Sequence, residues 1–141
     1  MIPKINKNGA LEILIVDDDQ NTCFMHRRLL DQRTLFNPVK ILGNGREAWE
    51  YVAELGATGT SFLIFLDLAL PLMNGWEFME HLQLYGADLN VFVVVVAAFP
   101  AESDRKRALA FPQVIGYEPK PLKPDRVNKI LNHKRVKQFL L

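Results

Sequence analysis

The sequence contains a single cysteine, Cys23, among its 141 residues. One thiol forms no internal disulfide and supplies no multi-cysteine zinc site, so neither device stabilises the fold. The longest apolar run, residues 91–100, has about half the length that a transmembrane helix requires. The first ten residues are polar and lack the apolar core of a signal peptide. These absences predict a cytoplasmic protein that does not insert into a membrane.

The chain also lacks an excess of charge of either sign. It has 17 basic and 16 acidic side chains, a net charge of +1, so no overall positive field indicates a nucleic acid as partner. The charge is nevertheless unevenly placed: residues 1–119 hold 10 basic and 15 acidic side chains, whereas residues 120–141 hold seven basic side chains and only Asp125 as an acid. This basic end is interpreted either as a solvated helix face or as a docking surface for an acidic partner.

The overall composition is that of a globular protein. Hydrophobic residues make up 49% of the chain and charged residues 23%, which is too apolar for a disordered chain and sufficient for a core. A chain of this length forms one domain. We expect the domain to span residues 11–141, after a flexible segment over residues 1–10.

Short apolar runs alternate with amphipathic segments along the chain. The runs are typical of buried strands and cover residues 11–16, 39–42, 62–66, 91–97 and 114–117. The segments between and after them predict five helices over residues 21–33, 46–55, 76–85, 103–110 and 124 to about 140, the last with a basic extension from about residue 132. Strict alternation predicts an α/β fold in which helices cover both faces of a parallel sheet.

Three local details of these helices follow from residue type and spacing. Cys23 and Met25, in the first helix, are interpreted as packing residues. Ser103 is a suitable N-cap for the fourth helix. The apolar end of the chain, residues 139–141 (FLL), either folds back on the domain or mediates self-association as a homodimer, and folding back is the favoured interpretation.

Charged residues follow three of the predicted strands at the point where each strand ends. Asp17, Asp18 and Asp19 follow the first strand, Asp67 follows the third, and Lys120 comes shortly after the fifth. In a parallel sheet these ends meet at one edge, where α/β proteins bind their ligands. Clustered carboxylates repel one another unless a cation neutralises them, and oxygen ligands favour Mg²⁺. Carboxylates, Mg²⁺ and a lysine make a phosphoryl-transfer site in which an aspartate can act as the nucleophile.

Each of these residues also has a simpler interpretation. The three consecutive aspartates suit the soluble end of a strand and the cap of the next helix, and Lys120 alone is an ordinary surface lysine. Asp67 is harder to explain in this way, because it follows five apolar residues and an acid beside a buried strand is costly without a partner. Their occurrence at one edge of the sheet favours the phosphoryl-transfer site.

Three motifs resemble the receiver domain of bacterial two-component response regulators. Residues 13–19 (ILIVDDD) are similar to the first strand and acidic pair of that family. Residues 64–75 (IFLDLALPLMNG) are similar to its phosphorylation strand and the loop after it, and residues 117–121 (YEPKP) to its terminal tyrosine and Lys-Pro motif. The resemblance covers nearly the whole chain, from about residue 12 to about residue 131. It implies a flavodoxin-like, doubly wound five-stranded parallel sheet in the order 2-1-3-4-5 with five helices.

The resemblance also implies a role for the residues of each motif. Asp67 is the expected phosphoacceptor, and Lys120 is expected to contact the phosphoryl group, with a cis peptide bond to Pro121. Asp19 has no part in this chemistry and is expected to cap the first helix. The implied cofactor is Mg²⁺, held by Asp18 directly, Asp17 through water, Asp67 and the backbone carbonyl of Ala69.

One position departs from the pattern of the family. Receiver domains usually carry Thr or Ser at the end of the fourth strand, where the hydroxyl meets the phosphoryl group, and Ala97 stands there in this chain. Residues 91–100 contain no hydroxyl side chain. An alanine side chain donates no hydrogen bond, so we expect weaker coupling between phosphorylation and the aromatic switch at Tyr117.

These observations predict a stand-alone receiver. It would accept a phosphoryl group on Asp67 from a sensor histidine kinase or a histidine phosphotransfer protein, and would signal by binding another, unidentified protein. Apart from Mg²⁺-dependent self-phosphorylation and self-dephosphorylation, it is not expected to be an enzyme. Two alternatives stay open: a receiver-like adaptor that works without phosphorylation, which Ala97 favours, and an aspartate-nucleophile phosphatase, which the run of three aspartates favours.

Overall fold

Five parallel strands form one sheet, in the order β2-β1-β3-β4-β5. The computed structural model describes residues 9–140, so the expected flexible segment lies almost entirely outside the described residues, as does Leu141. The strands are β1 (Leu11–Val16), β2 (Val39–Leu42), β3 (Ser61–Leu66), β4 (Val91–Ala97) and β5 (Val114–Pro119). The predicted parallel sheet and its strand order are confirmed.

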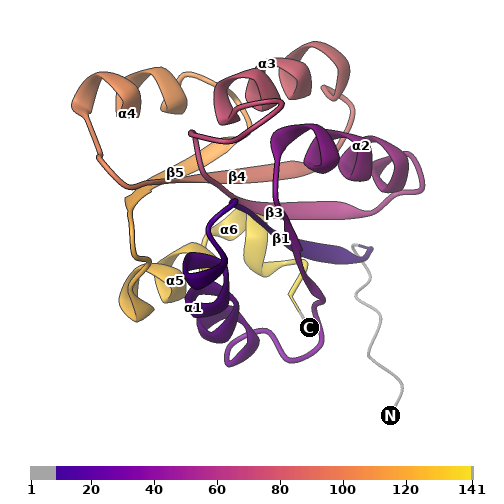
Figure 1. Ribbon diagram of the computed structural model, residues 1–141. Helices are drawn as coiled ribbons and strands as arrows, with labels where there is room; N and C mark the ends of the chain where they lie inside the picture. The colour runs from indigo at the N-terminus through magenta and orange to yellow at the C-terminus, as the bar shows by residue number, and fades with distance from the viewer. Residues whose placement is uncertain (1–8, 141) are drawn as a thin grey trace.

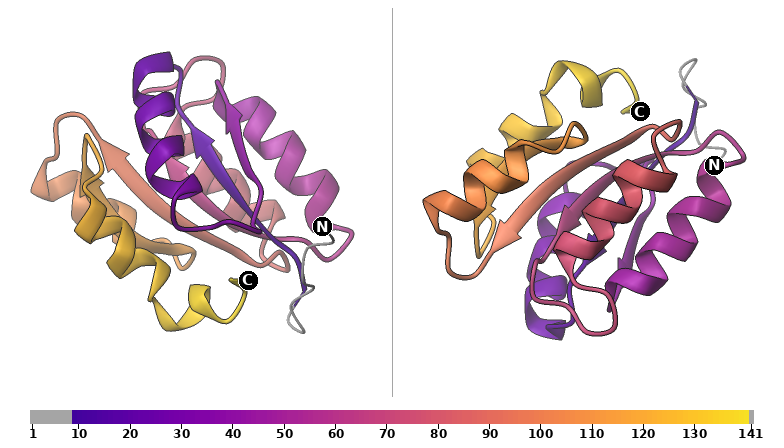
Figure 2. Two further views of the ribbon diagram at one scale, coloured as in Figure 1. Left: turned by 90° about the horizontal axis from the view of Figure 1, so that it is seen from below. Right: turned by 90° about the horizontal axis from the view of Figure 1, so that it is seen from above.

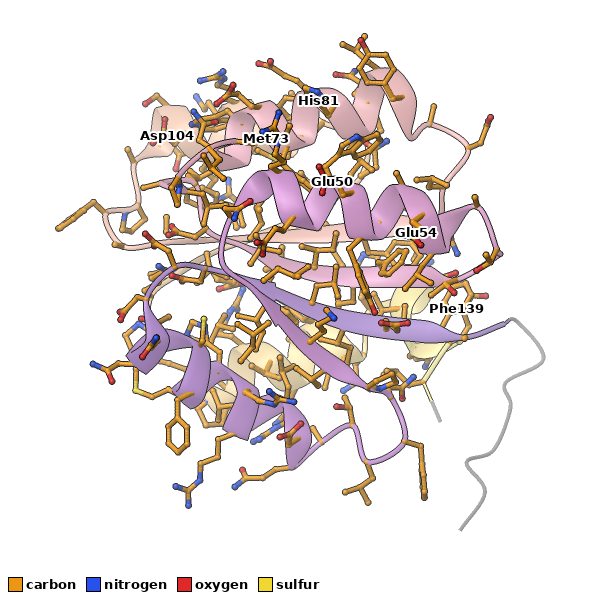
Figure 3. All side chains as sticks on the ribbon, turned by 45° about the vertical axis from the view of Figure 1, so that its right-hand side comes forward. Glu50, Glu54, Met73, His81, Asp104 and Phe139 are labelled. Atoms are coloured by element: carbon orange, nitrogen blue, oxygen red, sulfur yellow. The ribbon has the colours of Figure 1, made fainter. Side chains whose placement is uncertain are left out.

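Helices cover both faces of the sheet (Figures 1 and 2). One layer contains α1 (Gln20–Asp31), α5 (Pro124–Leu131) and α6 (Lys134–Lys137); the other contains α2 (Gly45–Gly56), α3 (Gly75–Tyr85) and α4 (Glu102–Leu109). Figure 3 labels Glu50 and His81 in the second layer above the sheet. Phe139 belongs to the core on the other side, with Val127 and Ile130 of α5. The described part of the chain contains no helix whose length and apolar character would allow it to cross a membrane.

The two layers of core follow from the alternation of side chains along each strand. In β1, Ile13 and Ile15 pack toward α1 and α5, whereas Leu14 and Val16 pack toward α2 and α3. Every residue of β3 and β4 is buried. Because each fully buried Val, Leu or Ile contributes roughly 1.5–3 kcal/mol, β3 and β4 supply much of the stabilising apolar burial.

Side-chain caps fix where several helices begin. Asp19 accepts a hydrogen bond from the backbone N–H of Asn21 at the start of α1, as predicted. Asn74 and Glu77 form a capping box at the start of α3. The prediction for α4 was wrong: Ala101 is the N-cap and makes no side-chain cap bond, and Ser103 lies exposed in the first turn. The helix begins at Glu102, two residues before the start that an N-cap at Ser103 would give.

The buried side of α1 differs from the predicted one. It consists of Thr22, Cys23, His26 and Leu30, whereas Met25 is 47% exposed. Cys23 is therefore a packing residue as predicted, and Met25 is not. The reason is that α1 turns a polar side chain, His26, toward the sheet. The buried face of the helix is therefore rotated from the face that the apolar residues alone predict.

The long last helix that the sequence predicts is divided in two, which gives six helices instead of five within residues 9–140. Asn132 closes α5, and His133 leaves the helical region with φ −59° and ψ 133°. The His133 side chain then accepts a hydrogen bond from the Arg135 N–H and caps α6. This break turns the chain so that Val136 and Phe139 are buried in the core. The expectation that the apolar end folds back is thus met for its described residues.

Replacing Phe139 with alanine should lower the free energy of unfolding by roughly 3 kcal/mol, the typical cost of removing a buried ring. Phe139 is 6% exposed, and its ring centroid lies 5.8 Å from that of Phe92 in β4. Urea denaturation followed by circular dichroism measures the change. The matched control is Phe99→Ala, because Phe99 is 91% exposed and should change stability by less than about 0.5 kcal/mol. Equal effects of the two substitutions would contradict a stabilising role for the buried Phe139 ring.

Candidate functional site

Three carboxylates and one ammonium group meet at the carboxyl edge of the sheet. Asp17, Asp18 and Asp67 each place a carboxylate oxygen within 4.8 Å of the others. Asp17 is 5% exposed and Asp67 8% exposed, whereas Asp18 is exposed. Lys120 Nζ lies 2.6 Å from Asp17 Oδ2 and 3.3 Å from Asp67 Oδ2. The structure thus brings together the four charged residues that the sequence assigned to one site.

The backbone of the sheet continues one residue beyond the strands and fixes the two buried acids. The N–H of Asp17 donates to the Leu42 carbonyl oxygen at 3.1 Å, and the N–H of Asp67 donates to the Val16 carbonyl oxygen at 3.0 Å. Asp17 Oδ1 also accepts a hydrogen bond from the Asp19 N–H at 2.9 Å. The two carboxylates therefore lie side by side because β1 and β3 are neighbouring parallel strands.

Lys120 reaches these acids from the end of β5, two strands from β3 in the sheet. Its N–H donates to the Ala97 carbonyl oxygen at 2.9 Å, which ties the segment after β5 to the end of β4. The Lys120–Pro121 peptide bond is cis, as the resemblance implied. The lysine side chain is 15% exposed, so its ammonium group is largely removed from water and held against the carboxylates.

The electrostatics of the site favour binding of a cation. Burial raises the pKa of Asp67, and the neighbouring Asp17 charge adds to this rise, although Lys120 and the Ala69 N–H oppose it. Burial lowers the pKa of Lys120, but its bonds to Asp17 and Asp67 outweigh burial and the net shift is upward. Three ionised carboxylates and one ammonium group leave two uncompensated negative charges. A donor set made of carboxylate oxygens suits a hard divalent cation.

The loop between β3 and α3 closes against Asp67 because Gly75 has no side chain. A Cβ at Gly75 would lie 2.6 Å from the Asp67 carbonyl oxygen, and the Gly75 N–H donates to the Leu68 carbonyl oxygen at 2.9 Å. Ala69 and Leu72 lie exposed in this loop, and Leu72 has a φ of 65°. The exposed residues of this loop that directly follow Asp67 are thus apolar.

Ala97 and Tyr117 lie on adjacent strands next to the site. Ala97 is 5% exposed and pairs with Pro119, whereas Tyr117 pairs with Val95. The Tyr117 ring packs against the core layer beneath α2, α3 and α4. Its hydroxyl is buried and has no hydrogen-bond partner among the described residues. At the position of the expected switch, the Tyr117 ring thus points into the core and residue 97 has no hydroxyl group.

Two residues of α1 that no motif includes contact Asp17 or the segment that follows Lys120. The Cys23 thiol donates to the Asp17 carbonyl oxygen at 3.4 Å. Burial and the nearby Asp17 charge raise the pKa of Cys23 to about 11, so the group is a thiol and serves in packing. His26 Nε2 accepts a hydrogen bond from the Leu122 N–H at 3.0 Å. Only the spacing of His26 from Cys23 and Leu30, three and four residues along one helix face, could have indicated that it is buried.

Comparisons with known proteins agree with this geometry. A family model of the response regulator receiver domain matches residues 13–132. Two-component response regulator 24 of Arabidopsis thaliana is 26% identical over 125 residues, which cover 88% of this chain and 84% of that protein.

Solved structures share the fold. A two-component response regulator from Cytophaga hutchinsonii superimposes with a TM-score of 0.80 at 23% identity, over 87% of this chain and 95% of its own. A second match comes from the co-crystal structure of the Saccharomyces cerevisiae histidine phosphotransfer signalling protein Ypd1 with the receiver domain of its downstream response regulator Ssk1. Its TM-score is 0.74 at 24% identity, over 100% of this chain and 95% of the matched chain. With the family model spanning residues 13–132, this chain belongs to the response regulator receiver domains of two-component signalling.

Proposed function

We propose that this receiver domain accepts a phosphoryl group on Asp67 and signals through contact with another protein. One observation carries the proposal: the Asp67 carboxylate lies 3.3 Å from Lys120 Nζ and within 4.8 Å of carboxylate oxygens of Asp17 and Asp18. Asp17 also contacts Lys120, at 2.6 Å, and the position of Asp67 in the motif of residues 64–75 distinguishes it as the proposed phosphoacceptor. A buried carboxylate at the open edge of a sheet has few structural uses and suits a nucleophile.

The residues of the site divide the chemistry among them. An Asp67 carboxylate oxygen attacks the phosphorus atom of the donor and forms the new P–O bond. The bond between phosphorus and the leaving group breaks, and the leaving group departs with its electron pair and takes up a proton from water. Lys120 is already within reach of Asp67 and would neutralise charge on the transferred phosphoryl oxygens.

The donors at this edge fit Mg²⁺. Asp18 would bind the ion directly, Asp17 through water, and Asp67 and the backbone carbonyl of Ala69 would complete the protein ligands. The two uncompensated negative charges of the site and its oxygen-only donor set support this assignment. When bound, Mg²⁺ supplies positive charge for the phosphoryl oxygens.

A histidine kinase or a histidine phosphotransfer protein is the proposed phosphoryl donor. The matched co-crystal structure pairs such a phosphotransfer protein with a receiver domain. In this chain, Phe24 is 67% exposed and Met25 47% exposed. Phe24 borders a hollow that Asp17 and Asp18 also line. An exposed aromatic side chain beside Asp17 and Asp18 gives a donor protein an apolar surface to contact.

Ala97 favours a second candidate, a receiver-like adaptor that works without phosphorylation. No hydroxyl at residue 97 is available to a phosphoryl group, and the Tyr117 hydroxyl already lies buried without a partner in the described structure. The phosphatase alternative loses support, because Asp19 accepts hydrogen bonds from the Asn21 N–H and the Thr22 hydroxyl. Its carboxylate thus serves the start of α1 and is not part of the acidic group.

Incubation with Mg²⁺ and acetyl phosphate should add one phosphoryl group to the protein, because Asp67 combines a nucleophilic oxygen with the charges that stabilise the product. Intact mass spectrometry measures the gain. Asp67→Asn, which keeps the shape of the side chain, should show none, whereas the exposed Asp88→Asn should behave like the wild type. Absence of a gain in wild-type protein that binds Mg²⁺ would favour the adaptor.

Ala97→Thr should strengthen the response to phosphorylation. One hydrogen bond to a charged group is worth roughly 1.5–3 kcal/mol, so the ratio of the two switch states should change by at least about tenfold more on phosphorylation than in the wild type. NMR signals of the Tyr117 ring, recorded with and without phosphorylation, report that ratio. The control is Ala98→Thr, which places the same side chain at the exposed next position. An unchanged response in Ala97→Thr would refute the weak-switch hypothesis.

Asp67→Asn should stabilise the metal-free protein at pH 7. Because burial raises the pKa of Asp67, the folded state holds a proton on this group more readily than the unfolded state, and the ionised carboxylate costs stability at neutral pH. This cost falls as the pH decreases through the folded-state pKa and disappears below the ordinary value of 3.8. Urea denaturation at pH 7 and pH 3 measures the difference, with the exposed Asp88→Asn as control. A variant less stable than the wild type at pH 7 would contradict this balance of charges.

A further inference from the structure

His26 is a buried polar side chain that the proposed chemistry does not use. It lies on the face of α1 that packs on the sheet and is 2% exposed. Its Nε2 accepts a hydrogen bond from the backbone N–H of Leu122 at 3.0 Å, a contact between residues 96 positions apart in the sequence. A buried imidazole needs such a partner, because burying an unpaired polar group is costly.

The bond to His26 completes the anchoring of the segment that carries Lys120. The Lys120 N–H donates to the Ala97 carbonyl oxygen at 2.9 Å, and Pro121 has no N–H to donate. The next donor along the chain is the Leu122 N–H, which bonds His26. The segment is therefore held on one side by β4 and on the other by a side chain of α1.

The charge state of His26 suits this contact. An imidazole nitrogen that accepts a hydrogen bond carries no proton, so the proton of the neutral ring is on Nδ1. Burial lowers the pKa of His26, and the Lys120 charge acts in the same direction, although Asp17 opposes both. The ring is accordingly neutral at pH 7 and available as an acceptor.

We propose that His26 is a positioning residue, which holds Leu122 and thereby keeps the Lys120 ammonium group against Asp17 and Asp67. Lys120 Nζ is 2.6 Å from Asp17 and 3.3 Å from Asp67, and its backbone is two residues from the bond to His26. A long lysine side chain reaches a fixed point only when its backbone is fixed, so a loosened Leu122 would let Lys120 sample other positions. The consequence for phosphoryl transfer rests on the function proposed for Asp67.

Two substitutions separate positioning from simple filling of the core. His26→Leu fills most of the same volume but has no acceptor, which leaves the Leu122 N–H buried without a partner. His26→Gln has an amide oxygen about as far from the backbone as Nε2 and restores an acceptor. The matched controls are the same two substitutions at His81, a histidine of α3 in the opposite helix layer.

The first readout does not depend on phosphorylation. Long-range ¹H–¹⁵N NMR spectra should show His26 with its proton on Nδ1. Hydrogen exchange of the Leu122 amide should become at least tenfold faster in His26→Leu, and the signals of the Lys120 ε-methylene group should shift. Both should stay close to wild type in His26→Gln and in the His81 variants. Unchanged Leu122 exchange and Lys120 signals in a folded His26→Leu protein would overturn the proposal.

The second readout is the rate of phosphorylation by acetyl phosphate with Mg²⁺. We expect a loss of about tenfold in His26→Leu and recovery in His26→Gln, with circular dichroism confirming that both are folded. Loosened Leu122 with a wild-type rate would overturn the positioning role while the function of Asp67 stands. A wild-type protein that is not phosphorylated would refute the proposed function, and the NMR comparison would still decide the role of His26. If His26→Leu does not fold, a His26→Gln protein with fast Leu122 exchange would overturn the proposal.

Discussion

Asp17 and Asp67 are buried at the ends of neighbouring strands, and the ammonium group of Lys120 contacts both, 2.6 Å and 3.3 Å away. Two carboxylates this close would repel strongly without an opposite charge. One lysine compensates only part of the acidic group, since the exposed Asp18 adds a third carboxylate. The site is consequently stable enough to exist and still negative enough to attract a cation. The rest of the structure maintains this partial compensation of charge, because the sheet fixes the acids and the segment after β5 fixes the lysine.

The two ends of the sheet serve different purposes. At the carboxyl edge, the missing side chain at Gly75 lets the loop after β3 pack closely on Asp67, and Asp18 is exposed. Toward the other end, Val136 of α6 and Phe139, which follows α6, are buried in the core, and Phe139 packs on Phe92 near the start of β4. The family model ends at residue 132, so α6 lies beyond the part of the chain that it matches. Apolar burial in this segment stabilises the fold at a distance from the site. At the site itself, repulsion among the acids lowers the stability of the fold.

Much of the fold and of the candidate site could be predicted from the sequence. Strand β4 is so apolar that its bounds follow from composition alone, and the acids that end β1 and β3 mark the carboxyl edge through their order along the chain. The errors have local causes. Met25 is exposed because α1 buries the polar side chain of His26 against the sheet. The last helix breaks at His133, since tertiary burial of Val136 outweighs the helical propensity of a continuous basic segment.

The sequence by itself determined the hydrophobic periodicity of the strands and helices and the strand ends at which charges occur. It also determined that residues 91–100 contain no hydroxyl side chain. These properties depend on neighbours a few positions apart, and local patterns express them. Only the tertiary structure decided which charge meets which, that the Tyr117 hydroxyl lies buried without a partner among the described residues, and that His26 bonds Leu122. Such contacts join segments up to 96 positions apart. They form because the packing of helices on a twisted sheet brings distant backbones together, and no local pattern encodes that distance.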